Sequence, residues 1–176
     1  VRGYRTELDP TDSQKQLFRQ CAGVARYAFN WGLRRQQESL ETTERHIPYA
    51  ALHKELVVLK RTSLRWMYEV PKCVAQEALR NLTQALGRYQ SRLSGRPVMK
   101  TKKRSTRAFR ITNDRIKVQV ERVRLSKIGF VRLKEKSYLP SHGVHILGAT
   151  ISERAGRWFI SLQVKTEITV QTNMGP

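Results

Sequence analysis

The spacing of apolar residues changes once along this 176-residue chain, and that change limits the folds open to it. Up to about residue 92 the apolar positions recur every three to four residues, as in helices, and from about residue 107 they alternate, as in strands. One short strand-like segment, "RGYRTEL" at 2–8, precedes the helical block. One strand, a block of helices and then further strands predict an α+β fold with helices inserted after the first strand.

Three helices are expected in the first half. Thr11 and Gln14 have the spacing of a capping box, and the apolar pattern that begins there continues past Gly23. Pro48 is placed to begin a short second helix. The third, over 71–92, has an uninterrupted apolar stripe along one face and is the most clearly predicted element of the chain.

The second half is predicted to be a small β-domain. Six segments have strand character: "RAFRIT", "RIKVQV", "RVRLS", "GFVRLK", "VHILGATI" and "RWFISLQVKT". The stretch "SERAG" is expected to form the hairpin turn between the last two. Short, regularly spaced strands with no helix between them predict five or six strands closed into a small antiparallel, OB-like barrel.

The charge balance favours a polyanionic partner. The chain has 34 Lys and Arg against 14 Asp and Glu, a formal net charge of +20, and such self-repulsion destabilises a compact fold unless a partner offsets it. A hydrophobic content of 39% is sufficient for a core, and no segment has the length of a membrane span. Nucleic acid is therefore the expected partner, with an anionic membrane surface as a weaker alternative.

No catalytic or metal-binding constellation is expected in the chain. The carboxylates are scattered, the four histidines contain no HxxxH pair, and neither cysteine has the neighbours of a catalytic nucleophile. Cys21 and Cys73 lack CxxC spacing, which argues against zinc and a disulfide framework and suits a reducing cytosol. We expect no cofactor in this chain.

The stretch "GVARYAFNWGLRRQQ" at 23–37 is the first candidate binding surface. Arg26, Asn30 and Arg34 stand four residues apart and share a helix face, with Arg35 beside them. We expect no glutamate within one turn to balance these arginines, and arginine is well suited to binding RNA phosphates and stacking on bases. The alternative is an exposed helix face whose arginines serve solubility.

A basic run between the helices and the strands is the second candidate. It contains nine cations and no acid: Arg88, Arg92, Arg96, Lys100, Lys102, Lys103, Arg104, Arg107 and Arg110. Tyr89 and Phe109 interleave with these cations, which favours a segment that follows a nucleic-acid backbone over a merely solvated connector.

The order of several segments resembles the TnpB/OrfB family, transposon-encoded RNA-guided DNA endonucleases related to type V CRISPR effectors. The matching segments are "YRTELDPTDSQKQLFRQCAGVARYAFNWGL", "YAALHKELVVLK", "WMYEVPKCVAQEALRNLTQAL", "GRPVMKTKKRSTRAFRITN" and "LSKIGFVRL". They contain a G-x-x-R-x-x-x-N-x-x-L element followed by P-K-x-x-x-Q and G-x-P-x-x-K elements. The resemblance implies a wedge barrel (1–10 and 96–170) interrupted by a helical recognition domain (11–95), with 171–176 as a linker toward a RuvC-like nuclease.

The resemblance also implies partners and site residues: a guide RNA, and a double-stranded target DNA read at a short flanking motif. The implied motif-reading residues are Tyr49, His53, Lys72, Cys73, Gln76, Thr112 and Asn113. Lys72, Cys73 and Gln76 would lie in the first turns of the third helix, where free N–H groups and the helix dipole favour an anion. Gln76 can bond adenine through two hydrogen bonds. The alternative is that Lys72 and Gln76 are ordinary first-turn residues.

The preferred function is the nucleic-acid-binding lobe of an RNA-guided DNA endonuclease, in which pairing with RNA reads sequence and the protein reads a short motif. The resemblance places cleavage in a Mg²⁺-dependent RuvC-like region after Pro176, and it implies a prokaryotic, cytoplasmic, nucleoid-associated protein. The alternatives are a nuclease-dead RNA-guided transcriptional repressor and a stand-alone basic RNA-binding protein of ribosomal type.

Overall fold

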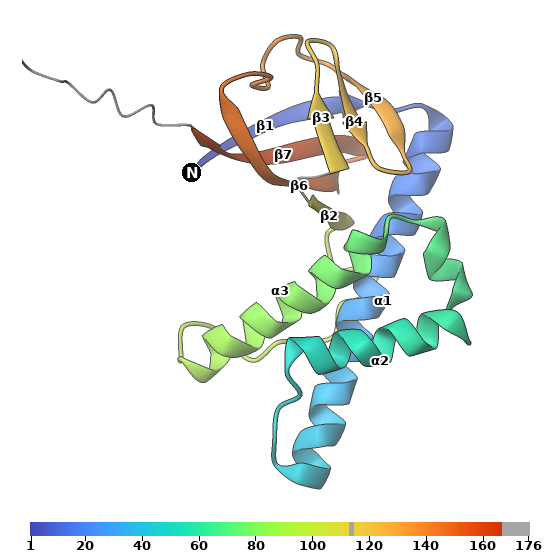
Figure 1. Ribbon diagram of the computed structural model, residues 1–176, viewed down its shortest axis with the longest axis vertical. Helices are drawn as coiled ribbons and strands as arrows, with labels where there is room; N and C mark the ends of the chain where they lie inside the picture. Colours follow the sequence, from blue (N-terminus) through green and yellow to red (C-terminus); the bar gives the residue numbers. More distant parts are fainter. Residues whose placement is uncertain (113–114, 167–176) are drawn as a thin grey trace, which may run out of the picture.

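The computed structural model describes residues 1–112 and 115–166 and has α+β architecture (Figure 1). Strands gather at one end of the molecule and helices at the other, and the long helix α1 runs from the sheet into the helical part. The elements in chain order are β1 (Arg2–Asp9), α1 (Asp12–Thr43), α2 (Tyr49–Arg61), the 3₁₀ helix η1 (Arg65–Glu69), α3 (Lys72–Gln90), β2 (Ala108–Thr112), β3 (Ile116–Val118), β4 (Arg122–Leu125), β5 (Gly129–Leu133), β6 (Val144–Arg154) and β7 (Arg157–Thr166).

The predicted helix starts are confirmed to within about a residue. The backbone N–H of Gln14 donates to Thr11 Oγ1 at 3.3 Å, and the Gln14 side chain accepts from the Thr11 N–H at 3.0 Å, which completes the capping box of α1. Pro48 and Pro71 are the N-cap residues of α2 and α3, one position before the first helical turn. Helix α1 continues without a break past Gly23, as the apolar spacing predicts.

All six predicted strand segments form strands, and with β1 they build one antiparallel sheet in the order β2-β6-β7-β1-β5-β4-β3. Strand β1 links the two halves, since Arg2–Glu7 pair with β7 while Leu8 and Asp9 pair with β5. The predicted barrel is not formed. In the described part of the chain, β2 and β3 are the two edges of the sheet and do not pair with each other. Strand β3 has three residues, a short edge for the ladder that closure requires.

Helices and sheet share a buried core. Phe18 of α1 lies against Phe109 of β2 and Trp158 of β7, with ring centroids 5.7 Å and 5.0 Å away, and all three side chains are buried. This aromatic cluster ties the first helix to two strands that come about 90 and 140 residues later in the chain. The core therefore fixes the helical part relative to the sheet.

Two backbone features shape the sheet near the candidate site. The β6–β7 hairpin turns at Ala155 and Gly156, whose φ angles of 51° and 75° suit a tight two-residue turn, so the predicted "SERAG" turn is confirmed. Strand β6 has a register shift between Ile146 and Gly148. Gly148 has a φ of 155°, and a Cβ there would lie 2.8 Å from the Arg110 guanidinium and 3.0 Å from the Ile111 carbonyl oxygen, so this position favours glycine.

Candidate nucleic-acid interface

The residues predicted to read DNA lie on three elements: Tyr49 and His53 on α2, Lys72, Cys73 and Gln76 on α3, and Thr112 at the end of β2. Asn113, also predicted, lies outside the described residues, as do residues 167–176, which include the predicted linker. Four of the seven, together with Arg80, form what we call the reading face: Tyr49, His53, Lys72, Gln76 and Arg80.

Tyr49, His53 and Gln76 are brought into contact at the crossing of α2 and α3. The Tyr49 and His53 rings stack with centroids 5.9 Å apart and an interplanar angle of 7°. The Gln76 amide nitrogen lies 3.1 Å from His53 Nε2. An amide N–H donates, so the ring nitrogen accepts, and this requires a neutral His53 that carries its proton on Nδ1.

The charge state of His53 agrees with this geometry. Burial is the main cause that lowers the pKa of His53 below its ordinary value, and the nearby cations Lys60 and Arg80 lower it further. The neutral ring is therefore favoured at neutral pH, and it holds the Gln76 amide in one orientation. Gln76 is half-buried, so its free amide oxygen has a defined position at the surface of the helix crossing.

Arg80 extends this cluster, and sequence reasoning missed it. Its guanidinium lies 5.2 Å from the Tyr49 ring centroid, within cation–π range, and pairs with Glu77 at 2.5 Å. Lys72, Gln76 and Arg80 follow one another at four-residue spacing on the exposed side of α3. That spacing was a signal present in the sequence.

A cleft between α3 and the sheet continues from Arg80 to Thr112. It is lined by Glu77, Arg80, Asn81, Gln84, Arg110, Thr112, Leu147, Thr150 and Gln163. Glu77 is buried and also pairs with Arg110 at 3.3 Å, and Arg110 Nη2 donates to Gln163 Oε1 at 2.9 Å. This chain of contacts sets Thr112 on β2 beside the polar side of α3.

Lys72 and Cys73 occupy different environments although they are neighbours. Lys72 is exposed at the first turn of α3, which no side chain caps, so backbone N–H groups there stay available to an anion. Cys73 is 5% exposed and lies in the core near Cys21, and burial, followed by this neighbour, raises the pKa of Cys21 to about 12. The Cys73 side chain is thus a packing group in this structure.

The four predicted residues of α1 have three different roles in the structure. Arg26 and Arg34 form no ion pair with any described residue. Asn30 instead clamps the segment after α3: its side chain donates to the Lys100 carbonyl and accepts from the Lys100 N–H, both at 2.8 Å. Lys100 extends its ammonium over the Phe29 ring at 4.1 Å, and burial lowers the pKa of this lysine.

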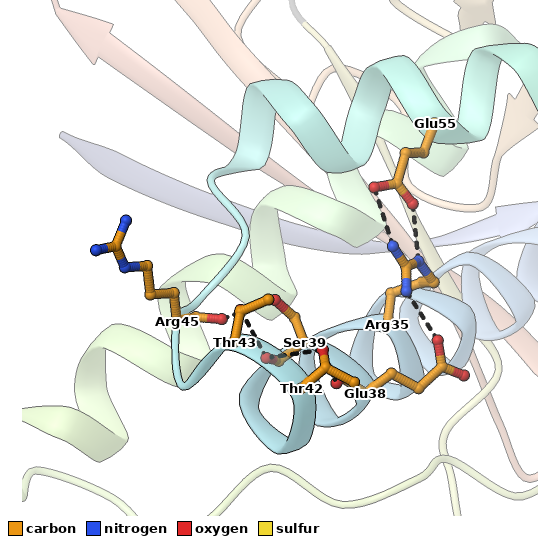
Figure 2. Close-up of polar contacts among 7 residues, drawn as sticks. All are labelled: Arg35, Glu38, Ser39, Thr42, Thr43, Arg45 and Glu55. Atoms are coloured by element: carbon orange, nitrogen blue, oxygen red, sulfur yellow. Dashed lines mark hydrogen bonds and ion pairs between the residues drawn. The ribbon is translucent and has the colours of Figure 1, made fainter.

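Arg35 links α1 to α2, as Figure 2 shows. Its guanidinium donates to both Glu55 carboxylate oxygens, at 2.8 Å and 3.2 Å, and to Glu38 at 2.8 Å. These hydrogen bonds raise the pKa of Arg35 further above its ordinary value. The expectation that no acid balances these arginines is wrong for Arg35, because Glu38 stands three residues later on the same helix. Nearby, the Ser39 hydroxyl donates to the Arg45 carbonyl and holds the loop that leads to α2 (Figure 2).

The basic residues after α3 also divide into paired and open groups. Arg107 pairs with Glu153 at 2.7 Å and Arg110 with Glu77, so both are held against the sheet. Lys102, Lys103 and Arg104 are exposed in the segment between α3 and β2, and none forms an ion pair with a described residue. Arg88 is exposed in the last turn of α3. Residues 91–107, hereafter the connector, thus carry open positive charge at Lys102, Lys103 and Arg104.

The described residues contain no group of three or more His, Cys, Asp or Glu side chains that could hold a metal ion. None of their helices combines the length and apolar character that crossing a bilayer requires.

Comparison with known proteins identifies relatives of the chain. A family model of OrfB and IS605 type, described as a helix-turn-helix domain, matches residues 1–45, which in this structure form β1 and the single uninterrupted helix α1. A protein of Escherichia coli (strain K12), provisionally named RNA-guided DNA endonuclease InsQ, is 29% identical over 172 residues. A protein of Streptomyces pristinaespiralis, provisionally named RNA-guided DNA endonuclease, is 27% identical over 171 residues.

Each alignment covers 96% of this chain and 42% of the relative, so the chain spans less than half the length of these two proteins. The family model matches the segment that carries the G-x-x-R-x-x-x-N-x-x-L element, and the relatives match nearly everything else. The resemblance indicated by the motifs agrees with these findings: residues 1–45 match the family model of OrfB and IS605 type, and nearly the whole chain is similar to two proteins provisionally named RNA-guided DNA endonucleases.

Proposed function

We propose that this chain is the nucleic-acid-binding lobe of an RNA-guided DNA endonuclease, which holds a guide RNA and reads a short motif in the flanking DNA duplex. The observation that carries the proposal is the separation of two kinds of polar surface. On the reading face the Gln76 amide is held by His53, and the Arg80 guanidinium lies over the Tyr49 ring and pairs with Glu77, whereas Arg26, Arg34, Lys102, Lys103 and Arg104 form no ion pair with a described residue. Names of the two relatives support the same activity.

For the reading face, the proposed partner is the edge of a base pair. Gln76 is held by His53 on one side, and Lys72 lies one turn earlier on the same helix. A side chain fixed in this way can discriminate a base through paired hydrogen bonds, whereas a mobile one loses more entropy on binding. Thr112 would approach the same duplex from the sheet, across the cleft beside Arg80.

For the open cations, the proposed partner is the RNA backbone. Arg26, Arg34, Arg88, Lys102, Lys103 and Arg104 have the character this requires, since phosphate contacts give affinity without reading sequence. Arg35, Arg107 and Arg110 are occupied by acids, so we assign them to holding elements in place. Asn30 positions the connector.

The proposed division of the chain follows the insertion of the three helices between β1 and β2. Residues 11–95 would form a recognition part, and residues 1–10 together with 96–170 a wedge part. Any Mg²⁺-dependent cleavage would belong to a nuclease region with its own carboxylates, because two-metal phosphoryl chemistry needs several of them around the ions.

The proposal is tested by the salt dependence of RNA binding. The RNA that co-purifies with the protein should bind less tightly as salt rises, because each neutralised phosphate releases counterions. The double variant Arg26→Ala, Arg34→Ala should reduce the slope of log K against log salt by about 1–2, with unfolding unchanged. Arg35→Ala is the matched control, expected to lower stability and leave the slope near that of the unmodified chain. A flat salt dependence would remove the proposal.

A further inference from the structure

A groove between α1 and η1 combines the open cations Arg26 and Arg34 with aromatic and acidic side chains that the proposed function does not use. It is lined by Arg26, Tyr27, Asn30 and Arg34 on α1 and by Trp66 and Glu69 on η1, with a few smaller neighbours. It lies away from the cleft between α3 and the sheet, which has a separate set of lining residues. Aromatic, cationic and acidic side chains therefore meet in one groove.

The aromatic pair leaves a stacking surface open. The Tyr27 and Trp66 ring centroids are 5.3 Å apart at an interplanar angle of 85°, an edge-to-face contact. In such a contact at most one face of the indole is covered by its partner, so at least one face stays clear of Tyr27. Trp66 is 43% exposed, an unusual position for the side chain with the largest apolar area.

The two arginines of the groove form no ion pair, whereas Arg35, their neighbour on α1, does. Arg26 and Arg34 stand eight residues apart, about 12 Å along the helix axis, and neither forms an ion pair in the described part of the chain. Arg35, the next residue, is bound by two glutamates. The charge of Arg35, which faces α2, is thus balanced by glutamates, whereas Arg26 and Arg34, which face the groove, are available to phosphates.

The connector runs beside the same groove. Both hydrogen bonds between Asn30 and Lys100 hold the start of its most basic part against α1. Lys102, Lys103 and Arg104 follow directly and are exposed. A nucleic-acid backbone that leaves the groove would meet further positive charge without crossing an acidic surface among these residues.

Glu69 favours RNA over DNA as the occupant. It is the one acid among the lining residues, and it forms no ion pair with another described residue. A carboxylate repels phosphate, but it can accept a hydrogen bond from a ribose 2′-hydroxyl, which DNA lacks. A duplex is excluded because its bases are stacked on each other and offer no free face to an indole.

We propose that this groove binds an unpaired RNA nucleotide, with its base stacked on Trp66 and the adjoining phosphates on Arg26 and Arg34. The inference rests on the proposed function, because it places one segment of the bound RNA on a particular surface. It adds that this segment is single-stranded and that the contact is made through a base face, which is tolerant of sequence.

The test uses the whole chain and short labelled probes: an unstructured RNA of about ten nucleotides, DNA of the same sequence, and a blunt duplex, a length within the usual site sizes for single strands. Trp66→Ala should weaken binding of the single-stranded RNA by about tenfold, the scale of losing one base–aromatic stack. Duplex binding should change little. Trp66→Phe should retain most of the affinity, and Tyr138→Ala, which removes a similarly exposed aromatic residue outside the groove, should have no effect.

Intrinsic fluorescence gives a readout that needs no destabilising variant. The single-stranded RNA should quench tryptophan emission of the unmodified chain, and Trp66→Phe should remove most of this quenching, since Trp158 is buried and Trp31 is half-buried against the core and does not line the groove. An equal loss of duplex and single-strand binding in Trp66→Ala would overturn the inference. The inference would also be overturned if the DNA strand bound as tightly as the RNA strand, or if poly-glutamate competed for the groove as well as RNA does.

Failure of this inference differs from failure of the proposed function. If only the inference fails, RNA binding remains strong and dependent on salt while the Trp66 variants behave as the unmodified chain does. If the proposed function fails, neither the structured RNA nor the short probe binds in a salt-dependent manner.

Discussion

Glu77 is a buried carboxylate that holds Arg80 of the reading face in place. It is 5% exposed and pairs with Arg80 on its own helix and with Arg110 on β2. Removing one partner of a buried ion pair is costly because the remaining charges lose their compensation. Here both arginines keep some contact with water, which reduces that cost.

Glu77→Gln should therefore lower the free energy of unfolding by about 1–2 kcal/mol, below the full cost of breaking a buried pair. The midpoint of urea unfolding measures this. Glu121→Gln is the control, because Glu121 pairs with Lys136 on the exposed surface and should have no measurable effect. An unchanged midpoint for Glu77→Gln would show that Arg80 and Arg110 are held by other contacts.

His53 should make stability depend on pH. Its pKa is lowered in the folded protein, chiefly by burial and then by Lys60 and Arg80, so below its ordinary value near 6.5 the unfolded chain binds more protons than the folded one. Stability should accordingly fall as pH decreases from about 6.5 toward the lower pKa of the folded state. His53→Gln should flatten this part of the profile of unfolding midpoint against pH. An identical slope with and without His53 would contradict the assignment.

At the scale of elements, the crossing of α1 and α3 sets the position of the helical part. Gly32 lies at this crossing, and a Cβ there would meet Leu79 and Leu82 side chains at 2.8 Å and 2.7 Å. Gly23 is on the same helix, and a Cβ there would meet nothing within 4 Å. Both glycines are therefore helical, but only Gly32 is packed closely against another helix.

Gly32→Ala should destabilise the protein by about 1–3 kcal/mol, because the helices must separate or the leucines change rotamer. Gly23→Ala should stabilise it by about 0.5–1 kcal/mol through helix propensity. Thermal unfolding of both variants measures the difference. If both alanines stabilise to the same extent, α1 and α3 do not pack as closely as described.

Local sequence patterns were enough to predict most helices and strands, whereas features that depend on contacts between distant residues could not be predicted. The capping box at Thr11 and the six strand segments depend on residues close in the chain, so spacing was enough to find them. Closure of the sheet depends on whether β2 and β3 pair, which no local pattern specifies. The same holds for the candidate site. The Arg35–Glu55 and Asn30–Lys100 contacts join residues 20 and 70 positions apart in the chain. The sequence therefore predicted one shared binding role for the four polar residues of α1, whereas the structure gives them three different roles.

At the scale of the whole molecule, the cations behind the net charge of +20 differ in whether an acid balances them. Cations near acids bind elements together, as Arg35, Arg107 and Arg110 do, whereas Arg26 and Arg34 of α1 and Lys102, Lys103 and Arg104 of the connector form no ion pair with a described residue. Composition predicted the polyanionic partner but not this division, since it depends on where each acid lies in three dimensions. The open cations are those that a nucleic acid would reach.

The proposed reading face and the open cations should have different effects on DNA binding, and one measurement distinguishes these effects. Binding of the protein–RNA complex to a library of duplexes, randomised beside the target, is compared for Gln76→Ala and Arg104→Ala. Gln76→Ala should relax preference at one or two base pairs, with about 1–3 kcal/mol at stake for a paired contact, and leave RNA affinity nearly unchanged. Arg104→Ala should lower affinity for all sequences alike. If both variants give the same uniform loss, the division into reading face and open cations is contradicted.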